Sequence, residues 1–166
     1  QPGKKRPVGD YLCRSPVLPP AGNKLFIDSV KVQLIAGKGG NGCVSFRREY
    51  RVPKGGPDGG RGGDGGHIYL VSDPNLNTLA FFRFHPINKA RKGAQGEGSN
   101  RRGKKGQDLY LRVPVGTVVK EASTGRILHD FLKPGEIYLA ARGGRGGRGN
   151  ASFATSTHQV PREFEK

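Results

Sequence analysis

Residues 55–66 read Gly-Gly-Pro-Asp-Gly-Gly-Arg-Gly-Gly-Asp-Gly-Gly, and this stretch limits the folds that the chain can adopt. In a regular helix or sheet, ordering one glycine costs roughly 0.5–1 kcal/mol more than ordering one alanine. Ordinary secondary structure is therefore not expected here. Two alternatives remain: a flexible arm, or polyproline-II strands packed so closely that any Cβ atom would clash.

Glycine is concentrated in three segments that also carry arginine or lysine. Of the 28 glycines, 22 lie in these segments, with 12 in residues 37–66, five in 93–106 and five in 143–149. Arg61, Arg142 and Arg145 each begin an Arg-Gly-Gly unit, a unit common in disordered RNA-binding segments. Asp58 and Asp64 alternate with Arg61, however, and apolar runs flank every glycine segment. We therefore expect ordered arms, with flexible Arg-Gly-Gly arms as the alternative.

The stretches between the glycine segments have the pattern of short β-strands. In residues 26–36, Val30, Val32 and Leu34 alternate with polar residues, which predicts a half-buried strand. Further strands are expected at 44–46, 67–72, 109–113, 117–120, 126–130 and 137–141, and a short helix within 73–82. Gly125 suits a turn between two of them. Seven short strands predict a mainly β fold with a small barrel or sandwich as its base.

The chain divides into a leader, residues 1–25, and a glycine-rich domain, residues 26–166. Residues 1–24 hold five of the 12 prolines and five basic residues against one acid, Asp10. Such a leader is expected to be extended and disordered unless a partner holds it. It is either the remnant of an organellar targeting extension or an arm that lies on RNA.

The charge of the chain points to a polyanionic partner. Its 29 basic and 13 acidic residues give a net charge of +16, for which RNA or DNA is the leading candidate. An anionic membrane is disfavoured because no long amphipathic basic helix and no membrane-spanning apolar run is visible. The two cysteines, Cys13 and Cys43, and the four histidines form no metal-binding pattern.

Two glycine motifs resemble nucleotide-binding loops without meeting their requirements. Residues 37–42 fit GxGxxG, but a strand-like run follows where a helix is needed. Residues 98–105 nearly fit the P-loop pattern, but Lys105 replaces the hydroxyl residue that would bind Mg²⁺. No nucleophile with a paired base and no carboxylate pair is visible. We therefore predict no catalytic, cofactor-binding or metal-binding residues in this chain. Because of these two motifs, a nucleotide-binding enzyme is kept as an alternative hypothesis.

Several long motifs resemble one known family, the N-terminal domain of Obg-type GTPases, from Phe26 to about Arg162. They are residues 26–28 (Phe-Ile-Asp), 39–42 (Gly-Gly-Asn-Gly), 46–49 (Phe-Arg-Arg-Glu), 52–57 (Val-Pro-Lys-Gly-Gly-Pro), 59–66, 113–119 (Val-Pro-Val-Gly-Thr-Val-Val), 142–150 (Arg-Gly-Gly-Arg-Gly-Gly-Arg-Gly-Asn) and 153–155 (Phe-Ala-Thr). The resemblance implies a β-barrel base from which polyproline-II-like glycine helices project as a rigid bundle.

The resemblance also implies a function. Three loops, residues 47–66, 83–106 and 142–158, are expected to reach the peptidyl-transferase region of the large ribosomal subunit, in a factor for assembly or quality control of that subunit. Cations would contact rRNA phosphates, and Phe153 would stack on an unpaired base. The predicted rRNA-contact residues are Arg47, Arg48, Lys54, Arg91, Lys92, Arg101, Arg102, Lys104, Arg145, Arg148, Asn150 and Phe153.

The chain departs from the family pattern in two ways. The G domain, which would bind GTP and Mg²⁺ and control binding, is absent, and a closing stretch of the barrel would normally follow Lys166; we expect the parent protein to continue. The leader favours an organellar member, in the mitochondrial matrix rather than the plastid, with the bacterial cytoplasm as the alternative.

Expected partners are rRNA, neighbouring ribosomal proteins and other assembly factors. Neither membrane insertion nor DNA binding is expected. The alternative function is a non-enzymatic RNA-binding protein with flexible Arg-Gly-Gly arms.

Overall fold

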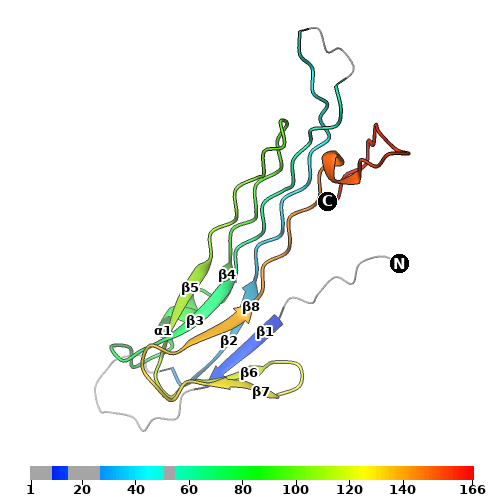
Figure 1. The fold of residues 1–166 in the computed structure, drawn as a ribbon. Coiled ribbons are helices and arrows are strands. Elements are labelled where there is room, and N and C mark those ends of the chain that lie inside the picture. Colours follow the sequence, from blue (N-terminus) through cyan, green and yellow to red (C-terminus); the bar gives the residue numbers. More distant parts are fainter. Residues whose placement is uncertain (1–8, 15–26, 51–54) are drawn as a thin grey trace. The chain divides into compact units, whose positions relative to one another are not determined.

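The computed structural model describes residues 9–14, 27–50 and 55–166, which form two compact units (Figure 1). The first, called here the β unit, comprises residues 1–35, 68–89 and 110–141. The second, the glycine unit, comprises residues 36–67, 90–109 and 142–166. Each unit is assembled from three separate stretches of sequence, so neither could be recognised as a continuous domain.

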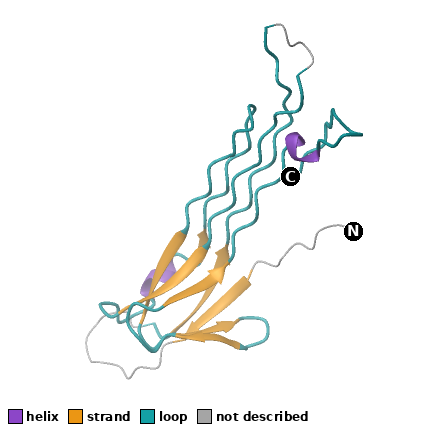
Figure 2. Cartoon of the chain, in the orientation of Figure 1, coloured by secondary structure: helices purple, strands orange, loops and turns teal. Residues whose placement is uncertain are grey.

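The mainly β fold expected from the sequence is confirmed in the β unit (Figure 2). One sheet has the strand order β4-β2-β1-β6-β7 and the other β5-β3-β8. The elements are β1 (Gly9–Arg14), β2 (Ser29–Ile35), β3 (Ile68–Asp73), α1 (Ala80–Phe84), β4 (Ile87–Lys89), β5 (Leu109–Pro114), β6 (Val118–Glu121), β7 (Ile127–Asp130) and β8 (Ile137–Ala141). The described strands form two sheets and do not close into a barrel.

Alternating apolar residues build the core of the β unit. Leu34, Leu70 and Val113 are almost completely buried on β2, β3 and β5. Phe82 of α1 and Phe131 after β7 fill the space beside them and are also buried. Burial of each such side chain contributes about 1.5–3 kcal/mol, and the strand alternation that produces it was visible in the sequence.

Two predicted elements differ in the structure. Residues 44–46 do not form a strand, because Phe46 makes only one isolated bridge, to Pro57. The helix begins at Ala80 and extends beyond the predicted end to Phe84. By contrast, the hairpin of β6 and β7 is confirmed, with Gly125 at φ 70°.

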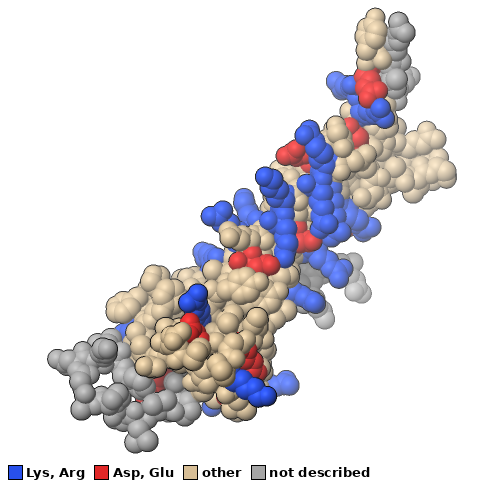
Figure 3. Space-filling model, turned by 60° about the vertical axis from the view of Figure 1, so that its left-hand side comes forward, with Lys and Arg blue, Asp and Glu red and all other residues tan. Residues whose placement is uncertain are grey.

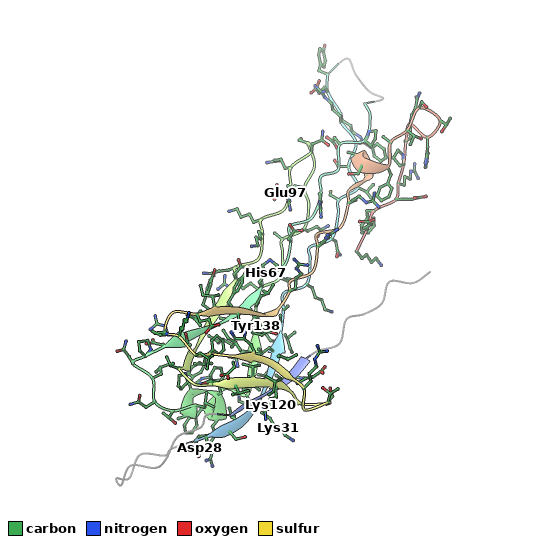
Figure 4. All side chains as sticks on the ribbon, turned by 60° about the horizontal axis from the view of Figure 1, so that its bottom comes forward. Asp28, Lys31, His67, Glu97, Lys120 and Tyr138 are labelled. Carbon is green, nitrogen blue, oxygen red and sulfur yellow. The ribbon has the colours of Figure 1, made fainter. Side chains whose placement is uncertain are left out.

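The strand β1 lies inside the predicted leader, in the middle of the larger sheet. It pairs antiparallel with both β2 and β6. Lys31 of β2 and Lys120 of β6 are both register partners of Leu12, so these two lysines belong to one face of the sheet (Figure 4). The rest of the leader lies outside the described residues.

The glycine unit consists of extended segments that run side by side without forming ordinary strands (Figure 2). We name the six that contact one another through backbone hydrogen bonds g1 to g6. They are g1 (37–43), g2 (59–67), g3 (91–97), g4 (101–108), g5 (142–150) and g6 (161–166). A 3-10 helix, Asn150–Phe153, follows g5.

Candidate nucleic-acid interface

Backbone hydrogen bonds join the glycine segments at every third residue. The amides of Gly37, Gly40 and Cys43 in g1 donate to carbonyl oxygens of g2 at 2.9, 2.8 and 3.1 Å. The carbonyl oxygens of the same three residues accept hydrogen bonds from g5. A polyproline-II helix has three residues per turn and no internal hydrogen bonds. The three-residue period is the one expected for such helices packed side by side.

Glycine is required because the backbones touch. At 19 glycines between residues 37 and 149, an added Cβ atom would lie less than 3.0 Å from a backbone carbonyl oxygen. In g2, for example, a Cβ on Gly62 would meet the carbonyl of Gly40 in g1. Ordered arms are thus the arrangement seen here, and the outward positions are occupied mainly by residues other than glycine.

The outward positions carry most of the positive charge of the protein. By sequence count, the glycine unit has 17 lysines and arginines against seven aspartates and glutamates. Lysine and arginine side chains line its visible face, with acidic groups between them (Figure 3). Charges held at fixed positions on a stiff backbone make this unit the candidate surface for a polyanion.

Four of the predicted contact residues are exposed but occupied by an acidic partner. Arg47 pairs with Glu49 at 2.8 Å, Arg101 with Glu97 at 3.7 Å and Arg148 with Glu165 at 2.8 Å, while Arg102 pairs with Asp64. Glu97 lies towards the hairpin that joins g3 to g4, as Figure 4 shows. A phosphate would have to compete with these carboxylates.

Other exposed cations have no ion pair within the described residues. Five of them were predicted from the sequence: Arg48, Arg91, Lys92, Lys104 and Arg145. Lys38, Arg142, Arg162 and Lys166 have the same property and were missed. The signal of Lys38 and Arg142 was present, because each stands beside glycine in a three-residue repeat. Lys54, also predicted, lies outside the described residues.

Asn150 is buried rather than displayed. Its side chain is inaccessible to solvent. Its Oδ1 accepts hydrogen bonds from the amides of Gly59 and Ser45, at 2.8 and 3.3 Å. Its Nδ2 donates to the carbonyls of Ser45 and Pro161, at 2.9 and 3.2 Å. All four hydrogen-bonding positions of the amide are used, so Asn150 ties three segments together and leaves no atom for RNA.

Phe153 is half-buried and already has a cationic neighbour. The guanidinium of Arg148 lies 5.2 Å from the centre of its ring, a distance typical of cation–π contacts. The two predicted contact residues therefore stack on each other. Base stacking on Phe153 would use the ring face that Arg148 does not cover.

Asp64 organises one side of the glycine unit. It accepts a hydrogen bond from the Gly146 amide at 2.8 Å and pairs with Arg102 and, at 3.6 Å, with Arg61. The amide and then these guanidinium groups hold the pKa of Asp64 below its ordinary value. Arg61 also donates to the Gly146 carbonyl at 3.0 Å. The Arg-Gly-Gly unit at Arg61 thus has an internal role, unlike those at Arg142 and Arg145.

The two glycine motifs that resemble nucleotide-binding loops do not fit a nucleotide phosphate. In residues 37–42, the amides of Gly37, Gly40 and Gly42 already donate to carbonyls of g2 and g6. In residues 98–105, the Gly103 amide donates to Arg61, and the segment forms a hairpin and g4 instead of a loop entering a helix. A phosphate cradle needs free amides, whereas these amides already have backbone acceptors. No helix among the described residues is long and apolar enough to span a membrane.

Comparison with known proteins identifies the family to which the sequence is similar. The sequence profile of the GTP1/OBG family matches residues 27–166. The chain is 57% identical over 141 residues to a protein named GTPase Obg from Acidobacterium capsulatum, covering 85% of this chain and 41% of that protein. It is 58% identical over 140 residues to GTPase Obg from Syntrophobacter fumaroxidans, covering 84% and 40%.

The matched region comprises nearly all of the β unit after the leader and the whole glycine unit. The chain spans about two fifths of the length of these relatives, with 41% and 40% covered. By the extent and identity of the match, this chain belongs to the GTP1/OBG family.

Proposed function

We propose that this chain is the RNA-binding part of an Obg-family factor that acts in assembly of the large ribosomal subunit. The observation that carries the proposal is the set of exposed cations without an ion pair in the described part of the glycine unit: Lys38, Arg48, Arg91, Lys92, Lys104, Arg142, Arg145, Arg162 and Lys166. All of them except Arg48 lie in g1 to g6, and the backbone hydrogen bonds between these segments, called here the glycine lattice, hold their backbones in fixed positions. Little conformational entropy is then lost on binding, and phosphates are the natural ligands.

GTP and Mg²⁺ belong to the proposal only through the rest of a longer protein. The relatives are named as GTPases, and the glycine motifs of this chain offer no phosphate cradle. Any nucleotide control would therefore come from residues outside this chain. The same proposal includes ribosomal proteins and other assembly factors as partners, and the peptidyl-transferase region as the binding site. It also includes a mitochondrial location, although the two relatives compared above are bacterial.

The first test is co-sedimentation of the chain with purified large ribosomal subunits at several salt concentrations. With about six phosphate contacts, the affinity should fall roughly a thousandfold between about 50 and 200 mM salt. Binding that does not change with salt would contradict the charge argument. Equal affinity for unrelated RNA would favour the alternative, a general RNA-binding protein.

A pair of matched variants sharpens this test. Replacing Arg142 and Arg145 by glutamine removes two unpaired cations of the glycine unit. Replacing Arg83 and Arg126, which are exposed and have no ion pair within the described residues, by glutamine removes the same charge from the β unit. The first variant should lower the slope of log affinity against log salt by about 0.7–0.9 per lost contact, and the second should leave it unchanged. Equal effects would show that net charge alone, without fixed positions, explains binding.

A further inference from the structure

Arg148 is the third member of a row of arginines on g5. Arg142, Arg145 and Arg148 are three residues apart, so in a polyproline-II helix they share one face at intervals of about 9 Å. All three are exposed. Within the described residues, Arg142 and Arg145 have no ion pair, whereas Arg148 holds Glu165. The three residues are alike in type and spacing, but only Arg148 has an ion-pair partner within the described residues.

Glu165 joins g6 to the bundle through every polar group it has. Its Oε1 accepts from Arg148 Nε at 2.9 Å, and its Oε2 accepts from the Arg148 backbone amide at 3.0 Å. Its own amide donates to the Arg148 carbonyl at 3.0 Å, and its carbonyl accepts from the Gly42 amide at 2.9 Å. A Cβ on Gly147 would clash with that carbonyl. One residue thus docks g6 on g5 and g1.

The pair is open to solvent and chemically replaceable. The side chains of Arg148 and Glu165 are 57% and 43% exposed. A guanidinium forms the same forked hydrogen bonds with a phosphate as with a carboxylate. An RNA backbone whose phosphates bind Arg142 and Arg145 would next reach the guanidinium of Arg148, which Glu165 already holds. Only one anion, the phosphate or the carboxylate, can accept both hydrogen bonds of that guanidinium.

We propose that Arg148 is an exchangeable clasp: an RNA phosphate replaces Glu165 on its guanidinium, and residues 162–166 are released from g1 and g5. The inference rests on the proposed RNA-binding function. Pro161 is the pivot, because it is buried and its carbonyl stays hydrogen-bonded to Asn150. RNA binding would then be reported to the segment that follows Pro161 without any change in the glycine lattice itself.

The amides of Gly42 and Glu165 report directly on the clasp, since both lose their acceptors when g6 leaves. The experiment follows hydrogen exchange of these amides by NMR in the 166-residue chain, with and without a labelled RNA hairpin of about 20 nucleotides, a probe long enough for several phosphate contacts. RNA should abolish their protection, while the Gly40 amide, bonded to g2, stays protected. RNA binding with both amides still protected would overturn the clasp.

Single substitutions separate the clasp from a merely structural pair. Glu165→Gln should remove protection at Gly42 and Glu165 without RNA and should tighten RNA binding, because Arg148 no longer has an anionic competitor. Glu163→Gln is the matched control, since Glu163 has no hydrogen bond or ion pair within the described residues; it should change neither protection nor affinity. Weaker RNA binding by Glu165→Gln would contradict the proposal.

The two arginines give the second comparison. Arg145→Gln and Arg148→Gln should each lower the salt slope by about 0.7–0.9, but only Arg148→Gln should expose the two amides without RNA. If Arg148→Gln leaves the slope unchanged, Arg148 never reaches a phosphate and the clasp is wrong while the proposed function stands. If the unsubstituted chain binds neither the hairpin nor large ribosomal subunits, the proposed function itself fails.

Discussion

A single buried amide, that of Asn150, holds together three loops of the glycine unit. Its four hydrogen bonds reach Ser45, Gly59 and Pro161, which are 105, 91 and 11 residues away in sequence. A glycine-rich bundle has few side chains with which to fasten its segments. The amide of Asn150 performs this task because it offers two acceptor and two donor positions at one point.

Asn150→Ala should therefore destabilise the protein strongly. The substitution leaves the Gly59 and Ser45 amides without an acceptor in a buried site, and each unsatisfied group costs about 1–3 kcal/mol. We expect the free energy of unfolding to fall by about 2–4 kcal/mol, as measured by urea denaturation. Asn41→Ala is the control, because the Asn41 side chain is exposed and its loss should matter by less than about 0.5 kcal/mol. Similar values for both variants would refute the role of Asn150.

At the scale of elements, the spacing of glycine reflects how many neighbours a segment has. In g4, the two glycines, 103 and 106, are three residues apart, and the two lysines between them are exposed. In g2, two residues in three are glycine, and all of those glycines are buried. The segment g2 is hydrogen-bonded to g1, g3, g4 and g5, whereas g4 contacts only g2 and g3. More neighbours leave fewer directions in which a side chain can point.

Two glycine substitutions test this lattice. Gly62→Ala places a methyl group against the Gly40 carbonyl, and separating the segments should reduce the free energy of unfolding by about 3 kcal/mol, at the upper end of overpacking costs. At Gly56 nothing lies within 4 Å of an added Cβ, so Gly56→Ala should be neutral or stabilise by up to about 1 kcal/mol. Thermal unfolding of both variants measures the difference. A tolerated Gly62→Ala would mean that the segments are not packed this tightly.

The sequence predicted regular elements better than it predicted contacts between distant residues. The β-strands of the core were recognisable because buried and exposed residues alternate along each of them. β1 was missed because the leader shows no hydrophobic period, and β4 because three residues are too short for a periodic signal. The run at 44–46 gained only one bridge because glycine segments, not strands, surround it. Exposed cations were identified by their spacing. Which of them are paired could not be predicted, because Arg102 and Asp64 are 38 residues apart and Arg148 and Glu165 are 17 apart.

For the whole molecule, positive charge is concentrated in one of the two units. By sequence count, the glycine unit carries a net charge of +10, while residues 27–166 of the β unit carry seven basic and five acidic residues, a net +2. Such crowding destabilises the glycine unit by self-repulsion. Four of its carboxylates offset part of this by accepting backbone amides: Asp58 from Ser99, Asp64 from Gly146, Asp108 from His67 and Glu165 from Arg148.

The glycine unit should consequently be the acid-sensitive part of the protein. Hydrogen bonds from the Gly146 and His67 amides and from the Arg148 side chain lower the pKa of Asp64, Asp108 and Glu165 respectively. Above about pH 5, these groups are largely ionised in both folded and unfolded chains, and their stabilisation is nearly complete. As the pH falls further, the unfolded chain binds protons first, so stability is lost until the folded carboxylates are also protonated.

Hydrogen exchange at about pH 5 and about pH 3 would measure this loss on either side of the ordinary carboxyl range. After correction for the intrinsic exchange rate, protection should fall at the Gly146, His67 and Arg148 amides, which the three carboxylates accept. It should persist at the Gln33 amide of the β unit, whose acceptor is the Pro86 carbonyl. Asp64→Asn should weaken the Gly146 hydrogen bond already at about pH 5 and flatten its pH dependence. Equal loss of protection in both units would show that acid acts through total charge, and that these three carboxylates have no special part in stabilising the glycine lattice.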